Sequence, residues 1–287
     1  MRILELVRRH PVVTYFVLAY WIAWGGIAVA MSTLAESGIP LLLLLFVPIA
    51  AGPTSASLIM TGVVDGKRGY RDLFSRLTRW RVAGRWYTAA LLINPLVILL
   101  VLGALSLLSA AFVPGILVTT DPAGKVGLAI AGGLAAGVFE EIGWTGFATP
   151  RLLKTRSVLS TGLLLGVLWS AWHIGGDIPG SATWGSLLPL RVLLWMFAGM
   201  TAYRVLMTWV YSHSRSLLVA ILMHAAFTGG QVLLEPIRAT QVESLVWWGL
   251  LAVGLWVVVG IVLVAERAHP LARFTPQPAS APMASTP

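Results

Sequence analysis

Cysteine is absent from this chain of 287 residues, which excludes disulfide bonds, thiolate catalysis and cysteine-ligated zinc. Charge is also scarce, because only 11% of the residues are Asp, Glu, Lys or Arg, whereas soluble domains carry roughly 25%. Hydrophobic residues make up 57% of the chain. This composition indicates a polytopic membrane protein.

Two further absences narrow the class of protein. No His-Glu-x-x-His sequence is present, which excludes the metal-binding helix of zincins and site-2 proteases. No internal repeat is evident, which argues against a transporter built from two related halves. The net charge of +9 would suggest nucleic acid binding in a soluble protein. Here most basic residues fall in short loops, so we expect the lipid bilayer as a partner and no nucleic acid.

Apolar segments of about 20 residues, the length that crosses a bilayer, recur along the chain. They cover residues 12–31, 39–62, 87–111, 126–149, 158–176, 190–211, 216–234 and 245–265. We therefore predict an all-α protein of about eight transmembrane helices, with residues 1–273 forming a single helical domain. The first apolar run is too long for a signal peptide, so we expect it to be retained.

The basic residues predict the orientation of these helices. With the N-terminus inside, the loops on the inner side contain all Lys and Arg residues, Arg204 among them, except Lys125, Arg191 and Arg238. The positive-inside rule then predicts a multi-pass protein of the plasma membrane with both termini in the cytoplasm. The loop at about 65–86 should form an amphipathic helix on the cytoplasmic surface. Residues 274–287, rich in Pro, Ser and Ala, should be disordered.

Two adjacent carboxylates, Glu140 and Glu141, interrupt the fourth segment. An ionisable side chain at membrane depth costs of order 2.5–3.5 kcal/mol on insertion scales, so it indicates a polar cavity with a function. His173 and His224, in two other segments, are the candidate partners, although each alone also fits an ordinary interhelical hydrogen bond. A buried glutamate can act as a general base, and histidines can orient water or polarise a carbonyl group.

Metal binding is a second use for the same residue types. Two histidines and one carboxylate are the ligands of several catalytic zinc sites, which leave one position open for water. Glu140, His173 and His224 therefore fit either a Zn²⁺ ion or a metal-free Glu/His site, and the sequence leaves both open.

Small residues precede the two glutamates at a spacing of four. Gly133, Gly137 and Glu141 form one such row, and the fifth segment has a matching pair, Gly162 and Gly166. Small residues allow another helix backbone to approach closely. The pattern predicts that the fourth and fifth helices pack together near the carboxylates.

Three short stretches resemble the motifs of one known family. Residues 140–152, with the pattern Glu-Glu-x-Gly-Trp-x-Gly-Phe, resemble the first motif of the CPBP intramembrane proteases. That family, also called Abi, includes the CAAX prenyl endopeptidases and their bacterial relatives. Residues 169–173 resemble its second motif, in which an aromatic residue precedes a histidine, and residues 224–228 resemble its third. The resemblance covers residues 126–234.

This resemblance implies a CAAX-protease-like helical core and an intramembrane endopeptidase acting near the cytoplasmic side. Glu140 would activate the attacking water and Glu141 would be an accessory carboxylate. His173 and His224 would position the water or the tetrahedral oxyanion. The substrate would be a peptide or protein, membrane-associated or prenylated in some relatives.

Two positions depart from the family pattern. Thr145 stands where an arginine is common, and Thr228 stands where asparagine or aspartate is common. Thr228 can still donate one hydrogen bond to an oxyanion. The departures leave open a catalytically inactive immunity or scaffold protein of the same family. The paired glutamates also leave open a proton-coupled transporter.

Overall fold

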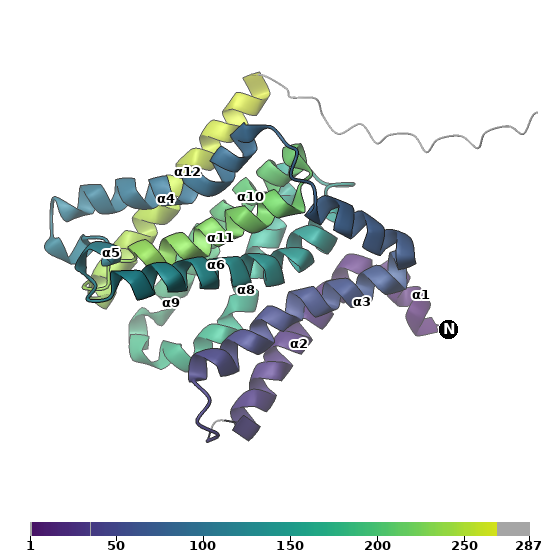
Figure 1. Cartoon of the computed structure of the whole chain (residues 1–287), viewed down its shortest axis with the longest axis horizontal. Helices are drawn as coiled ribbons and strands as arrows, with labels where there is room; N and C mark the ends of the chain where they lie inside the picture. Colours follow the sequence, from purple (N-terminus) through teal and green to yellow (C-terminus); the bar gives the residue numbers. More distant parts are fainter. Residues whose placement is uncertain (1, 35, 269–287) are drawn as a thin grey trace, which may run out of the picture.

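The structure, a computed structural model, describes residues 2–34 and 36–268, so the tail predicted at 274–287 lies outside the described residues. The described chain is helical throughout its regular structure, as predicted (Figure 1). The long helices are α2 (Pro11–Leu34), α3 (Leu41–Leu77), α4 (Gly84–Ser106), α6 (Pro122–Gly143), α8 (Val158–Ser181), α10 (Thr201–Ser214), α11 (Leu217–Leu234) and α12 (Gln241–Ala268). The short elements are α1 (Arg2–Arg9), η1 (Ala110–Phe112), α5 (Gly115–Val118), η2 (Trp144–Ala148), α7 (Thr149–Leu152), η3 (Ala182–Leu187), α9 (Leu188–Arg191) and η4 (Val192–Met200).

Eight helical segments of the described chain are long and apolar enough to cross a membrane, and they coincide with the eight predicted segments. Two of them continue through short elements: the fourth runs over Pro122–Leu152 and the sixth over Thr183–Ser214. Large apolar side chains are exposed on their outer faces, among them Trp21, Leu100 and Ile261. Such exposure is expected where lipid, which is as apolar as these side chains, replaces water.

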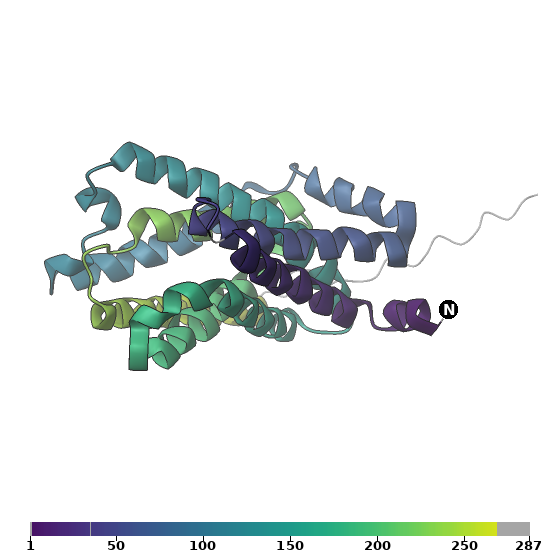
Figure 2. The same cartoon turned by 90° about the horizontal axis from the view of Figure 1, so that it is seen from below.

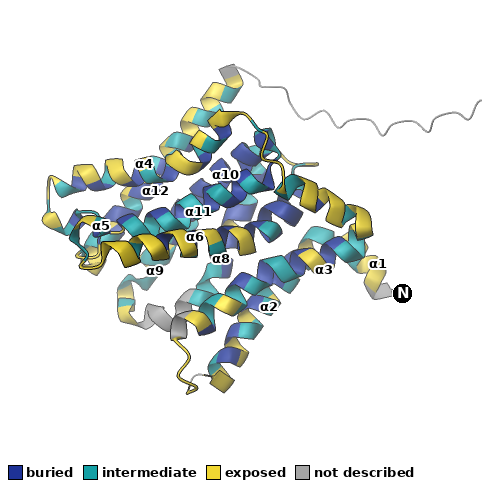
Figure 3. Ribbon diagram, in the orientation of Figure 1, coloured by how far each residue is buried: buried dark blue, intermediate teal, exposed yellow. Residues whose placement is uncertain are grey.

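The helices form an elongated bundle in which α6, α8, α10 and α11 lie between two outer pairs (Figures 1 and 2). The outer pairs are α2 with α3 on one side and α4 with α12 on the other. Buried residues concentrate where the four inner helices meet (Figure 3). Both predicted glutamates and both predicted histidines belong to these inner helices.

Helix α3 is longer than the segment predicted at 39–62, because it continues to Leu77 after a kink at Gly66. Gly66 has φ 58° and ψ −146°, a conformation that a residue with a Cβ adopts only at a steric cost. The part beyond the kink overlaps the amphipathic helix expected at about 65–86. In it Leu73 is buried, whereas Phe74 is exposed.

The glycine row of α6 packs against α11. A Cβ on Gly133 would lie 2.5 Å from the carbonyl oxygen of Ala225, and a Cβ on Gly137 would lie 2.5 Å from that of Ile221. No real Cβ tolerates such distances, so glycine is required for this close approach. The approach brings the end of α6 beside His224 of α11.

The glycine pair of α8 packs against a different helix, α10. A Cβ on Gly162 would lie 2.6 Å from Cα of Val205, and a Cβ on Gly166 would lie 2.7 Å from Cα of Thr201. The prediction that the fourth and fifth helices pair through these glycine rows is therefore wrong. Each row meets a backbone from the C-terminal half of the chain.

Candidate active site

Two adjacent carboxylates lie buried at the end of α6. Glu140 is 6% exposed and Glu141 is fully buried. Beyond them α6 passes into the π-helical segment Trp144–Ala148, a widened turn that is frequent at functional sites. Because neighbouring helical residues point about 100° apart, the two carboxylates reach different partners.

Glu141 is bound on all sides by donors. Its two oxygens accept hydrogen bonds from Nη1 and Nη2 of Arg204, each at 2.9 Å. Oε2 also accepts a short hydrogen bond from the Thr145 hydroxyl, and Oε1 lies 2.7 Å from Nδ1 of His224. A carboxylate can only accept, so Nδ1 of His224 carries the hydrogen. Glu141 therefore fixes the tautomer and the orientation of the His224 ring.

Within the part of the protein that the structure describes, one carboxylate oxygen of Glu140 accepts hydrogen bonds and the other accepts none. Its Oε2 accepts from the indole Nε1 of Trp169 at 2.7 Å and from that of Trp144 at 3.4 Å. Its Oε1 lies 3.7 Å from Nε2 of His224. That distance is too long for a direct hydrogen bond. One water molecule can contact both atoms.

Trp169 connects the site to the second predicted histidine. Its ring centroid lies 5.2 Å from that of His173 and 5.3 Å from that of His224. Nδ1 of His173 donates to the carbonyl oxygen of Trp169 at 2.9 Å, so the neutral ring presents Nε2 as an acceptor. The guanidinium of Arg204 lies 4.4 Å from the opposing Trp169 ring centroid, within cation–π range.

The structure brings Glu140, Glu141 and His224 into mutual contact and places His173 next to them through Trp169. Thr228 lies four residues after His224 on α11 and is half-buried. Among the described residues its hydroxyl has no hydrogen-bond partner, so it is available to a ligand.

Arg204 is the residue of this buried cluster that the sequence analysis misplaced. The prediction put it in a cytoplasmic loop, but it lies within α10, is 1% exposed and forms a buried ion pair with Glu141. Thr145, one of the two departures from the family pattern, donates a hydrogen bond to the same carboxylate. A single arginine within an otherwise apolar predicted helix was the available signal, since such a charge needs a buried partner.

The residues do not gather around one point as zinc ligands do. No group of three or more His, Asp or Glu side chains in the described part of the chain is arranged to hold a metal ion. Nδ1 of both histidines is already used, and Glu140 Oε1 lies 3.7 Å from His224 Nε2. As these side chains lie, they do not form a zinc site, and zinc binding stays a prediction.

Comparison with known proteins shows which family this chain resembles. The family model described as type II CAAX prenyl endopeptidase Rce1-like matches residues 122–229, the stretch from the start of α6 to α11. The chain is also similar to CAAX prenyl protease 2 of Methanococcus maripaludis, with 25% identity over 238 residues, which cover 79% of this chain and 84% of that protein. Both comparisons support what the three motifs predicted, because they find the chain similar to the CAAX-protease-like intramembrane proteases of the CPBP family.

Proposed function

We propose that this protein cleaves a peptide bond of a membrane-associated protein, with Glu140 as the general base. The observation that carries the proposal is the pair of atoms Glu140 Oε1 and His224 Nε2, 3.7 Å apart in a buried site. A water molecule between them would donate one hydrogen bond to each. Its oxygen lone pairs would then point away from both bases, toward a substrate.

Catalysis follows in two steps. The water gives a proton to Glu140 Oε1 while its oxygen attacks the carbonyl carbon, and the carbonyl oxygen becomes an oxyanion. The oxyanion then re-forms the double bond, the C–N bond breaks, and Glu140 returns the proton to the leaving nitrogen. Such acid–base catalysis contributes typically ~10²–10⁴-fold to the rate.

The remaining residues position these groups. Arg204 holds Glu141, and Glu141 holds the His224 ring so that Nε2 faces Glu140. Neutral His173 offers only an acceptor at Nε2, which suits a water hydrogen and not an oxyanion. We therefore propose that the Thr228 hydroxyl, an uncharged group, donates the hydrogen bond to the oxyanion.

The family supports a peptide or protein substrate, and the name of the archaeal relative suggests which one to test first. A CAAX sequence is a C-terminal motif whose cysteine carries a prenyl chain. We propose that the chain acts at the cytoplasmic side of the plasma membrane, because the loops predicted to be basic lie at the site's end of the bundle.

An inactive immunity or scaffold protein is less well supported, because Thr145 and Arg204 both bind Glu141. Thr145, although it departs from the family pattern, therefore contributes a hydrogen bond to the site.

The test compares wild type, Glu140→Gln and Glu36→Gln, each purified as the full chain. The probes are a peptide ending in a farnesylated CAAX sequence and its unprenylated twin, and mass spectrometry detects any new C-terminus. We expect cleavage by wild type and by Glu36→Gln, an exposed control of the same chemistry. Glu140→Gln should lose ~10²–10⁴-fold in rate while melting at the wild-type temperature. Undiminished cleavage by a folded Glu140→Gln protein would refute the proposed base.

A further inference from the structure

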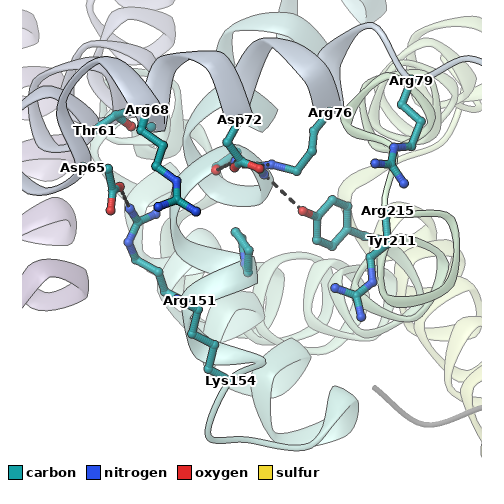
Figure 4. Close-up of a pocket in the computed structure, with 13 residues that line it drawn as sticks. Thr61, Asp65, Arg68, Asp72, Arg76, Arg79, Arg151, Lys154, Tyr211 and Arg215 are labelled. Carbon is teal, nitrogen blue, oxygen red and sulfur yellow. Dashed lines mark hydrogen bonds and ion pairs between the residues drawn. The ribbon is translucent and has the colours of Figure 1, made fainter. Parts of the chain in front are cut away.

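A second polar feature lies apart from Glu140 and His224. A partly open cavity of about 480 Å³ lies between α3 on both sides of its kink, residues 146–154 and the end of α10 (Figure 4). Its volume falls in the range of small-ligand sites, roughly 300–1,000 Å³. Six basic residues line it: Arg68, Arg76, Arg79, Arg151, Lys154 and Arg215.

Acidic side chains do not balance this charge. The cavity has two of them, and both are engaged: Asp65 pairs with Arg151, and Asp72 pairs with Arg76 at 2.9 Å. Six basic residues against two acidic ones leave a formal excess of four positive charges around one space. Burial lowers the pKa of Arg215 below its usual value, and nearby Arg79 lowers this pKa further, against the opposing effect of Tyr211.

A neutral donor adds to the charged ones. Tyr211 is 2% exposed and lines the cavity. Its hydroxyl oxygen accepts a hydrogen bond from Nη1 of Arg76 at 3.1 Å. Its own hydrogen has no acceptor among the described residues. A buried hydroxyl of this kind is costly to leave unpaired. An oxygen atom of a ligand in the cavity would be a favourable acceptor for its hydrogen.

The arrangement of donors fits a phosphate group. In Figure 4, Arg79, Arg215 and Tyr211 lie on one side of the cavity, and Arg68, Arg151 and Lys154 lie on the other. Guanidinium groups bind phosphate oxygens in bidentate fashion, and charge-assisted hydrogen bonds are about twice as strong as neutral ones. An anion between the two sides would contact both.

The surroundings of the cavity favour a lipid as the source of that phosphate. The part of α3 beyond the kink exposes Phe74 (65%), and the turn after it exposes Trp80 (62%). Aromatic side chains are enriched at the level of lipid headgroups. Basic pockets at the cytoplasmic ends of transmembrane helices are suited to anionic headgroups.

We propose that this cavity binds a phosphate-bearing anion, supplied by the headgroup of an anionic phospholipid. The proposal does not depend on the cleavage chemistry, because none of the cavity's lining side chains contacts Glu140 or His224. Arg76 nevertheless links the two regions: its Nη2 donates to the carbonyl oxygen of Gly146 at 2.9 Å, in the π-helical segment that follows the glutamates.

The experiment measures lipid binding to the full chain in detergent by native mass spectrometry. The probes are dioleoyl-phosphatidylglycerol, dioleoyl-phosphatidylcholine and inorganic phosphate. The cavity variant is Arg68→Gln/Arg79→Gln/Lys154→Gln. The control variant, Lys67→Gln/Arg71→Gln/Arg156→Gln, removes the same number and kind of charges from exposed positions that do not line the cavity.

We expect wild type to prefer phosphatidylglycerol over phosphatidylcholine, and the cavity variant to bind phosphatidylglycerol about tenfold or more weakly, a loss of ~1.4 kcal/mol. The control variant should change by less than about threefold, because its three side chains do not line the cavity and can act on the bound anion only through screened solvent. If inorganic phosphate competes as well as the lipid does, the site holds and a soluble phosphate is the occupant. Equal losses in the two variants, or no preference between the two lipids, would overturn the site.

Discussion

Two charged regions of this molecule differ in how their charges are balanced: one is paired internally and the other has a surplus of positive charge. In the buried cluster of Glu140, Glu141, His224 and Arg204, the Glu141–Arg204 pair is bidentate and Glu141 has a donor at every side. The cavity next to it has four more positive charges than negative ones among its lining side chains. Gly146, bound by Arg76, lies between them.

The difference follows from burial. An unpaired charge in a buried site costs several kcal/mol, so the charges of the cluster must be neutralised by one another, except for Glu140, the proposed general base. An open cavity lets water and salt stabilise surplus charge until a ligand arrives. Paired charges thus indicate side chains that are held in a fixed geometry, and a surplus of positive charge indicates a site that binds an anionic ligand.

The largest effect should come from breaking the buried ion pair. Glu141→Leu or Arg204→Met alone leaves one buried charge without its partner and should lower the free energy of unfolding by ~3–5 kcal/mol. The double variant removes both charges and should cost much less than either single change. Unfolding of all four proteins in mixed micelles gives the coupling energy. Costs that simply add would show that the pair is not coupled.

A smaller effect should come from the hydrogen bond that holds Glu140. Trp169→Phe removes the indole N–H at 2.7 Å from Oε2 but keeps an aromatic ring. A hydrogen bond to a charged group is worth ~1.5–3 kcal/mol, so we expect cleavage to slow by ~10–100-fold.

Trp172→Phe is the matched control, because Trp172 is equally buried but its indole nitrogen has no hydrogen-bond partner. It should change the cleavage rate by less than about threefold, since no bond is lost. Equal slowing by the two variants would mean that ring packing, and not the bond to Glu140, sets the rate.

The smallest effect should come from the cavity. The cavity variant should change the free energy of unfolding by no more than ~0.5 kcal/mol, because it removes mutually repelling charges at a solvent-accessible surface. Unfolding under the conditions used for the ion pair makes the values comparable. A loss above ~2 kcal/mol would show that these residues are structural, and would remove the contrast between the two regions.

The membrane-spanning segments and most of the buried polar cluster could be predicted from the sequence. Hydropathy over about 20 residues depends on local composition, so the eight segments were confirmed. Glu140, Glu141 and His224 were found because buried charges are rare and their motifs are short and local. The sequence predicted an apolar segment ending at residue 62 and a separate amphipathic helix from about residue 65, whereas the structure joins both in α3 with a kink at Gly66.

Helix partners could not be predicted in the same way. A row of glycines predicts that another helix backbone approaches closely, but it does not identify that helix. In the structure the row of α6 contacts α11, and the row of α8 contacts α10. Arg204 was misplaced for a related reason. A loop-charge count assumes that an arginine near a predicted boundary is solvated, whereas its partner, Glu141, lies 63 residues earlier in the chain.

The most direct test is an experimental structure of the detergent-purified chain at a resolution that shows bound water. Our account predicts one water molecule within about 3.2 Å of both Glu140 Oε1 and His224 Nε2, with the His224 ring held by Glu141. It would be contradicted by a metal ion bound at about 2.0–2.2 Å by Glu140 and the two histidines, or by a Glu140 carboxylate turned away from His224.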